Sequence, residues 1–549
     1  MKNQNCLLFF ILISFQVSGQ EWQESVSFEI RNTLENQFLD ERVILQQIPL
    51  YSSETMLRFY TNRAFDPAWF EQGKLTCNAY EMRYQIQQSF FDGLVPEDYH
   101  LGIINDYFET LEKDQDEYTV KQQANLDIFL TDAYIMLSTH LFTGKLNPDE
   151  MAANWNIQRK NSNLLIDPRL EEAIQGNKIK TSLQELWPSF RIYPRMRESL
   201  REFHEINKKE KPKWNKLTVE KSLKPGERNP ILHQIRERLI FWGDLEPYEA
   251  PDLNQYDSIL LSGVQRLQVR NGLLPDGVLG AGTLEALNKS PQDLMGQVAV
   301  NLERLRWLPD SLKFDKLILV NIANFQMDYL KDRDTLLTSN AIVGKDYRAT
   351  PVFDARMSYL VFSPTWTVPP TILANDVIPA VKRDLGYLAA KKMRILTHSG
   401  VEVDPKSIDW SKITARNFPY MVRQDPGQQN SLGLVKFMFP NKYNVYIHDT
   451  PTRSLFSRDN RALSSGCIRI EKPIEFAKLL LEEFPQWDEE AIKKAMNSGK
   501  ERTVNLKESI PVVILYLTFW TDGKNEMHVR NDLYKRDGRI LAELYKTRN

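Results

Sequence analysis

One stretch, residues 445–470 (VYIHDTPTRSLFSRDNRALSSGCIRI), most constrains what this chain can fold into. Residues 445–447 are apolar and β-prone, which predicts a buried strand that ends at His448. A Ser-Ser-Gly turn precedes Cys467, and the isoleucines on either side of Arg469 predict a second strand. The sequence therefore predicts a thiol on a sharp turn, with an imidazole arriving from a neighbouring strand.

This arrangement suits acyl transfer. A free thiol has a pKa of about 8.5, so a nearby imidazolium would raise the fraction present as thiolate. The backbone amides of Gly466 and Cys467 are candidate donors to a tetrahedral oxyanion. Ser464, Ser465 and Arg469 complete the predicted oxyanion and substrate-binding set. Arg469 either binds a substrate carboxylate or braces the turn, and spacing alone leaves open that Cys467 is a small buried hydrophobe.

The pattern HDTP...LF...RALSSGCIRI resembles the catalytic signature of the L,D-transpeptidases, the YkuD-type cysteine enzymes that cross-link peptidoglycan. Within that family it is most similar to the large periplasmic, YcbB-like branch. The residues of the family pattern fall on His448, Ser464, Gly466, Cys467 and Arg469. Position 465 is Ser where many members have His, so no role of that second histidine is carried over to this chain.

The first residues predict export. Residues 1–19 contain Lys2, an apolar run over residues 6–15 and small residues at 17–19, which is typical of a secretion signal. The run is shorter than an ordinary membrane span, although an uncleaved anchor remains an alternative. We therefore expect a periplasmic protein without a membrane span in the mature chain. After removal of the signal only Cys77 and Cys467 remain, so the fold is not expected to depend on disulfides.

A chain of 549 residues is too long for one core and predicts several domains. Residues 20–222 show helical periodicity, for example over 35–50 and 122–141, and resemble the helical scaffold of the same branch. Residues 223–292 contain VQRLQ...GLLPDGVLGAGTLEALN, with Thr283 as a predicted helix cap. This segment resembles the three-helix type 1 peptidoglycan-binding domain. The alternative is a helical spacer without binding capacity.

Residues 293–549 predict the β-rich catalytic domain and a C-terminal tail. Alternating apolar residues predict strands with one buried face, and Pro369 and Pro370 end one of them before a helix that Thr371 is expected to cap. The resemblance implies that residues 373–423, approximately, form a lid over the substrate groove. The predicted fold class is thus α+β multidomain: helical scaffold, three-helix module, and YkuD-type domain with a lid insertion.

The other histidines and the net charge bear on whether the protein binds a metal or a nucleic acid. His398 is expected at the surface of the lid, and no Cys, Asp or Glu is recognised at metal-binding spacing around the other five: His100, His140, His204, His233 and His528. No metal or other cofactor is therefore predicted. The net charge of −2 gives no general reason to expect nucleic-acid binding. Asp449 is a poor orienter for His448, because strand neighbours point to opposite faces. A backbone carbonyl is an alternative, and the sequence does not decide what orients the ring.

The resemblance implies the following chemistry. Cys467 attacks the L-to-D peptide bond of a donor tetrapeptide stem, D-Ala leaves, and an amine of an acceptor stem opens the thioester to give a 3→3 cross-link. Carbapenems should acylate the same thiol, and the expected partners are peptidoglycan stem peptides and proteins of cell-wall synthesis and cell shape. The alternatives are an L,D-carboxypeptidase, lipoprotein attachment, and a wall-binding scaffold with an inactive domain. A papain-like or NlpC-type hydrolase is disfavoured because the histidine precedes the cysteine here.

Overall fold

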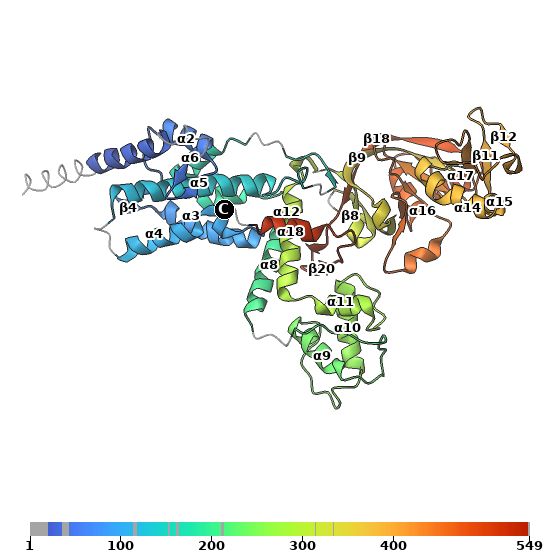
Figure 1. The fold of residues 1–549 in the computed structure, drawn as a ribbon, viewed down its shortest axis with the longest axis horizontal. Helices are drawn as coiled ribbons and strands as arrows, with labels where there is room; N and C mark the ends of the chain where they lie inside the picture. Colours follow the sequence, from blue (N-terminus) through green and yellow to red (C-terminus); the bar gives the residue numbers. More distant parts are fainter. Residues whose placement is uncertain are drawn as a thin grey trace, which may run out of the picture.

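The structure is a computed structural model that describes residues 20–35, 43–113, 118–151, 154–160, 164–209, 214–312, 314–332 and 334–546. The predicted signal at residues 1–19 lies outside these ranges. Figure 1 shows a helical body at one end of the molecule, a β-rich body at the other, and a small helical module set off to one side. The predicted α+β multidomain fold is confirmed.

The helical region is organised around the long helix α5 (Val120–Thr143), which is buried along most of its length. Thr119 and Gln122 form a reciprocal capping box at its start, which satisfies free amides of the first turn. Residues 20–35 are also helical. The helices that pack on α5 are α2 (Ser53–Asn62), α3 (Cys77–Gln88), α4 (Leu101–Lys113), α6 (Ile166–Gln175) and α7 (Ile179–Gln184).

The prediction of a helix over residues 35–50 is wrong for residues 43–50, the part that the structure describes. Residues 44–49 form a hairpin of two short strands, β1 (Ile44–Leu45) and β2 (Ile48–Pro49). Gln46 and Gln47 both have positive φ, 51° and 68°, which is the backbone of a two-residue hairpin turn. A second small hairpin joins β3 (Phe70–Glu71) to β4 (Lys74–Leu75). Such short strands depend on tertiary packing more than on local periodicity.

The three-helix module contains α9 (Ile231–Phe241), α10 (Ser258–Arg270) and α11 (Ala281–Asn288). It has its own apolar core, in which Leu232, Leu239, Val264 and Leu287 are fully buried. Thr283 does not cap α11, as the sequence predicted. The cap is Gly280, and the Thr283 hydroxyl donates to the carbonyl of Val278 from inside the first turn.

A buried helix, α12 (Pro291–Arg306), lies between the helical region and the β-rich body (Figure 1). It packs on α8 (Ile192–Lys208) of the helical region and on the C-terminal helix α18 (Asp537–Leu544). The side chains of Glu303 and Arg306 are completely buried and paired at 2.5 Å. The main core of the β-rich body includes Tyr193, Met196, Leu200 and Phe203 of α8. The core thus extends beyond the boundary near residue 292 that the sequence predicted.

The β-rich body is a ten-stranded sheet that closes on itself, because β14 pairs with both β15 and β9. Pairing around the closed path follows the order β14 (Val435–Met438), β15 (Ile447–His448), β17 (Ile468–Ile470), β8 (Asp334–Gly344), β7 (Gln326–Lys331), β6 (Lys316–Asn321), β18 (Arg502–Leu515) and β9 (Val352–Phe362). Two further strands pair at its edges: β16 (Ala462–Ser464) with β8, and β5 (Trp155–Asn156), from the helical region, with β9. Helices α16 (Pro473–Leu480) and α17 (Glu489–Met496) contribute to its core, and β19 (Phe519–Thr521) and β20 (Met527–Val529) form a hairpin.

An insert over residues 366–424 forms a second, smaller sheet in the order β10 (Trp366–Thr367), β13 (Met421–Gln424), β11 (Met393–Leu396) and β12 (Glu402–Val403). It has a separate apolar core that includes Val381, Ile395 and Val422. The helix predicted from Thr371 is broken into α13 (Pro370–Ile372), a π-helix η7 (Leu373–Val377), α14 (Ile378–Arg383) and α15 (Gly386–Ala390). Its N-cap is Pro369 and not Thr371. Across the ranges that the structure describes, no helix combines the length and apolarity needed to cross a membrane.

Candidate active site

The predicted histidine and cysteine lie on two paired strands. Strands β15 and β17 are parallel, with Ile447 opposite Ile468 and His448 opposite Arg469. Both isoleucines are fully buried in the main core. Because side chains alternate along a strand, His448 and Arg469 share the other face. Cys467 directly precedes β17 and is therefore two residues from Arg469, on that same face.

The turn before Cys467 is held by its own hydrogen bonds. The buried Ser464 hydroxyl accepts from the Gly466 amide at 3.1 Å and donates to the Cys467 carbonyl at 2.6 Å. Gly466 has φ = 115°, a conformation that favours glycine. In this conformation the Gly466 amide and the Ser464 hydroxyl are thus engaged with the turn. The Cys467 amide makes no hydrogen bond within the described ranges and is free to donate.

A second layer of residues supports this turn from the C-terminal tail. The Thr350 hydroxyl donates to the Gly466 carbonyl at 2.9 Å and accepts from the Gly344 amide. The Tyr534 hydroxyl donates to the Gly344 carbonyl at 2.6 Å. The tail is therefore part of the framework that positions the thiol, a role that sequence reasoning missed for both Thr350 and Tyr534.

His448 is oriented by a backbone carbonyl, a question that the sequence left open. Its Nδ1 lies 2.5 Å from the carbonyl oxygen of Asp449, which favours a neutral ring with its proton on Nδ1. The Leu432 backbone also acts on the ring. The Asp449 carboxylate is occupied elsewhere, by the Leu434 amide at 2.9 Å and by Arg453 at 3.2 Å. Asp449 thus contributes its carbonyl group, and not its side chain, to the orientation of the imidazole.

The protonation states differ from those that the sequence suggested. Burial, with a smaller contribution from the Arg469 cation, lowers the pKa of His448 to about 3. Burial also raises the pKa of the Cys467 thiol, against the opposing effects of Tyr446 and Arg469. We expected a charged His448 that raises the thiolate fraction of Cys467. That expectation is wrong for the resting protein. The pair is a neutral thiol and a neutral imidazole, because charging either group would require burying its charge.

Tyr446 is a site residue that sequence reasoning missed. Its phenol and its backbone amide both act on the Cys467 sulfur, and its ring lies 5.6 Å from the His448 ring. Tyr446 also packs against the apolar core of the insert. Burial raises the pKa of its hydroxyl, so Tyr446 is a neutral donor. The alternation of side chains along residues 446–448 was a signal that could have identified it.

Arg469 is a cation without a counter-ion. Within the described ranges it forms no hydrogen bond or ion pair, and its buried Nε has no partner. Its charge acts on both Cys467 and His448. Position 469 is thus suited to stabilising negative charge that develops at the thiol or at a bound carbonyl.

Cys467 opens onto a cavity of about 890 Å³. The helical region, the loop after β8, the insert and the turn before β17 all contribute to its wall. The lining residues are Asn154, Asn156, Tyr347, Arg348, Ala349, Pro351, Thr371, Asn375, Asp376, Tyr443, Asn444, Val445, Ser465, Gly466 and Cys467. The thiol itself lies 3.7 Å from the carbonyl oxygen of Asn444. Of the predicted site residues, Ser465, Gly466 and Cys467 line the cavity, while Ser464, His448 and Arg469 lie behind its wall.

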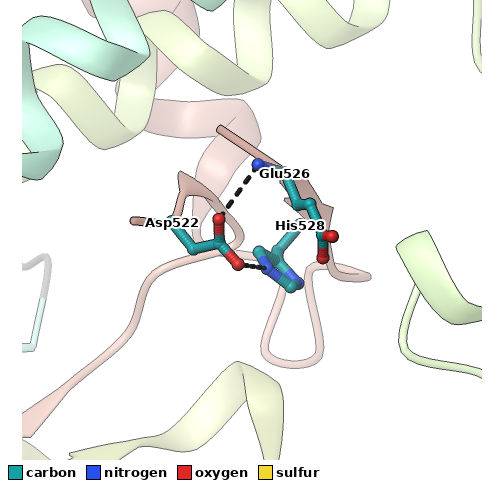
Figure 2. A group of neighbouring side chains, drawn as sticks. All are labelled: Asp522, Glu526 and His528. Atoms are coloured by element: carbon teal, nitrogen blue, oxygen red, sulfur yellow. Dashed lines mark hydrogen bonds and ion pairs between the residues drawn. The ribbon is translucent and has the colours of Figure 1, made fainter. Parts of the chain in front are cut away.

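The expectation that His528 has no acidic neighbour is wrong. The ligand atoms of Asp522, Glu526 and His528 lie within 4.8 Å of one another in the β19–β20 hairpin (Figure 2). Asp522 accepts from His528 at 3.0 Å and from the Glu526 amide at 2.9 Å, bonds that close the hairpin turn. The His528 ring stacks on Trp520. These contacts explain the cluster as a structural feature of an exposed turn.

Comparison with known families divides the chain into three matched segments. A scaffold domain matches residues 54–200. A family described as "Putative peptidoglycan binding domain" matches residues 228–287. The L,D-transpeptidase catalytic domain, YkuD, matches residues 315–513, which include His448 and Cys467 but not Asn154, Asn156 or Tyr534.

Similar proteins carry related names. A curated protein of Haemophilus influenzae, described as "Putative L,D-transpeptidase", is 37% identical over 286 residues, which are 52% of this chain. The match spans 57% of that relative's own length. Two solved structures were also matched: an L,D-transpeptidase from Mycobacterium smegmatis (12% identity, 37% of this chain and 58% of that chain, TM-score 0.19), and residues 123–326 of one from Xylanimonas cellulosilytica (13% identity, 55% and 100%, TM-score 0.16).

Proposed function

Because residues 315–513 belong to the L,D-transpeptidase catalytic-domain family, we propose that this chain forms 3→3 peptidoglycan cross-links through a thioester on Cys467. One observation carries the proposal. A free cysteine lies on a braced turn at the wall of a large cavity, and a histidine with a fixed tautomer lies on the paired strand. These are the parts that acyl transfer through a cysteine requires.

In the first step the Cys467 thiol attacks the carbonyl carbon between the diamino acid and D-Ala of a donor tetrapeptide. The Nε2 lone pair of His448 takes the thiol proton as the S–C bond forms. The C–N bond then breaks, and the D-Ala amine leaves with that proton. The resting pair is neutral, so His448 acts as a general base during the attack and not as a preformed imidazolium.

In the second step the amine of an acceptor stem attacks the thioester. His448 removes the amine proton, the new C–N bond forms, and the C–S bond breaks to regenerate the thiol. The tetrahedral oxyanion in both steps is stabilised by the Cys467 amide, which is free to donate, with support from the Arg469 cation. We propose that Ser464 and Gly466 act mainly by holding the turn, and that Ser465 faces the substrate.

The other regions are assigned supporting roles. The helical region (residues 20–222) frames the cavity through Asn154 and Asn156, and the insert acts as a lid. The three-helix module (residues 223–292) binds the wall. Residues 1–19 direct export, and the enzyme works in the periplasm on stem peptides. The catalytic domain (residues 293–549) should be acylated by carbapenems at Cys467. The boundaries at 222 and 292 remain predictions.

The test is mass spectrometry of muropeptides after incubation of residues 20–549 with disaccharide-tetrapeptides, beside Cys467→Ala. We expect dimers that have lost one D-Ala, and none from the variant. Cys467-dependent tripeptides without dimers would instead indicate an L,D-carboxypeptidase. No Cys467-dependent product would contradict the proposal unless a carbapenem still forms an adduct on Cys467, which would indicate an active enzyme that lacks its partner.

A further inference from the structure

Arg348 is placed beside the nucleophile turn with most of its guanidinium unused. Its Nη1 donates to the Ser465 hydroxyl at 2.8 Å and to the Asp376 carboxylate at 2.7 Å. Within the part of the chain that the structure describes, Nε and Nη2 make no hydrogen bond. The side chain is 16% exposed, so three N–H donors of this half-buried cation have no acceptor among the described residues and stay in contact with solvent.

Few charged side chains line the cavity. Among the described residues that line it, Arg348 and Asp376 are the only charged ones. The remaining hydrogen-bonding side chains are neutral, and they include the amides of Asn154, Asn156 and Asn375. A carboxylate that enters the cavity would therefore meet the Arg348 cation at the wall, while Arg469 is not among the lining residues.

The partner of that cation comes from the insert. Asp376 lies in the π-helix η7 (Leu373–Val377), a rare backbone conformation that is frequent at functional sites. Its side chain is 46% exposed, and an ion pair with that much water contact is weak and exchangeable. Asp376 thus occupies the position that a carboxylate of a ligand would take, on an element outside the closed sheet.

We propose that Arg348 binds a carboxylate of the donor stem peptide and that Asp376 takes the place of this carboxylate in the empty site. The inference rests on the proposed function and deepens it. In a tetrapeptide the leaving D-Ala carries a free carboxylate one residue beyond the carbonyl that Cys467 attacks. In a pentapeptide the same group is tied up in an amide and has no charge for the guanidinium to bind.

The assignment makes Arg348 a specificity-determining residue for the length of the donor stem. A site with a half-buried guanidinium discriminates against a ligand that lacks the matching charge, because such a ligand displaces water from the free N–H donors without replacing its hydrogen bonds. The carboxylate could come from D-Ala at position four or from the side chain of the diamino acid at position three. Both are the same chemistry, and amidation of one or the other separates them.

The experiment compares three disaccharide-tetrapeptide donors: the free acid, the D-Ala amide, and the amide of the diamino acid side-chain carboxyl. The enzymes are wild type, Arg348→Gln, Arg348→Lys, Asp376→Asn and, as a matched control, Arg394→Gln. Arg394 lies in the insert and, like Arg348, is an arginine paired with carboxylates, here Glu402 and Asp425, but it does not line the cavity. The measured quantity is kcat/KM for the Cys467-dependent product, with the alkylation rate of Cys467 by neutral iodoacetamide as a check of site integrity.

We expect wild type and Arg394→Gln to prefer the free acid over one of the amides by about tenfold or more, and Arg348→Gln to lose that preference. Arg348→Lys should retain part of this preference, because the positive charge remains but the paired N–H donors of the guanidinium are lost. Asp376→Asn should lower KM for the free acid because the internal competitor is gone. If Arg348→Gln loses only the preference for the free acid over the D-Ala amide, the bound carboxylate is that of position four. If it loses only the preference over the other amide, the bound carboxylate is that of position three.

Two results would overturn the inference while leaving the proposed function intact. One is a wild-type enzyme that turns over all three donors equally well. The other is an Arg348→Gln enzyme that loses acid and amide donors by the same factor, which would make Arg348 a positioning residue for the Ser465 turn. The proposed function itself would be contradicted by a wild-type enzyme whose Cys467 reacts with iodoacetamide but which gives no Cys467-dependent product from any donor.

Discussion

The helical region and the three-helix module join the catalytic body in different ways. The helical region contributes the strand β5 to the sheet, four buried side chains of α8 to the main core, and two asparagines to the cavity. The three-helix module has a closed core of its own. Its contacts with the rest include Trp242 packed on Phe203, and polar contacts from Arg530, Asn531 and Asp459.

This difference indicates which parts of the chain belong to the enzyme. A region that shares a core with the catalytic body cannot unfold without exposing that core, and its loss should remove activity. A region with its own core and a mainly polar boundary can unfold alone. The scaffold is thus part of the active site, whereas the module is an attachment to it.

The largest expected effect comes from a matched pair of buried leucines. Leu200 of α8 is 2% exposed in the main core, and Leu239 of α9 is fully buried in the module core. Each change to Ala should cost about 3–5 kcal/mol through lost burial and a residual cavity. By scanning calorimetry with an activity readout, Leu200→Ala should lower the Tm of the transition that abolishes activity by about 10 °C. Leu239→Ala should leave that transition in place. Equal loss from both variants would break the comparison.

A matched pair of glycines isolates packing from backbone strain. Gly93 and Gly243 have nearly the same positive φ, 71° and 74°. A Cβ on Gly93 would lie 2.6 Å from the Cα of Ala299 on α12, whereas a Cβ on Gly243 would meet nothing within 4 Å. Backbone strain should lower the free energy of unfolding of both alanine variants by about 1–2 kcal/mol. The clash should lower that of Gly93→Ala by about 2 kcal/mol more. Urea unfolding measures the difference, and similar midpoint shifts would show that the junction can relax.

A buried carboxyl gives the module its own pH dependence. Burial raises the pKa of Asp244 to about 6, despite its ion pair with Arg270. The folded module therefore binds a proton that the unfolded chain, with a pKa of about 3.9, has already released. Its stability should fall as the pH rises from about 4 to about 6, by about 2 kcal/mol. Asp244→Asn should flatten that slope in the module's unfolding transition and leave the catalytic transition unchanged.

The smallest effect is expected at the polar boundary. The Asp459 carboxylate accepts from the Leu274 amide at 2.9 Å in an exposed contact. Asp459→Ala should change the free energy of unfolding of either transition by no more than about 0.5 kcal/mol. A loss of several kcal/mol, measured by the same urea titration, would mean that the module is held as firmly as the scaffold.

Much of this organisation could be predicted because its signals are local. The turn before Cys467, the strand that carries His448 and the fold class follow from short stretches of sequence. The hairpin at Gln46–Gln47 was missed because strands of two residues carry almost no periodicity. The broken helix from Pro370 was missed because a π-helix has no sequence pattern of its own.

The cavity and the charges could not be predicted, because they depend on distant segments. Arg348, Asp376 and Asn154 meet across more than two hundred positions of sequence, and nothing local marks them as neighbours. The neutral state of His448 depends on burial, which is a property of the folded protein. Tyr446 is different, since its place two residues before His448 was available from strand alternation alone.

The most direct test of the central claim is to trap the acyl-enzyme. Wild-type protein is mixed with a tetrapeptide donor whose diamino acid side-chain amine is acetylated, so that it cannot act as an acceptor. The mixture is quenched in acid within seconds and analysed by intact-mass and peptide-mapping mass spectrometry. The account predicts an adduct equal to the donor minus D-Ala on the peptide that contains Cys467, and release of one D-Ala per adduct. An adduct on another residue, or cross-linked product from Cys467→Ala, would contradict it.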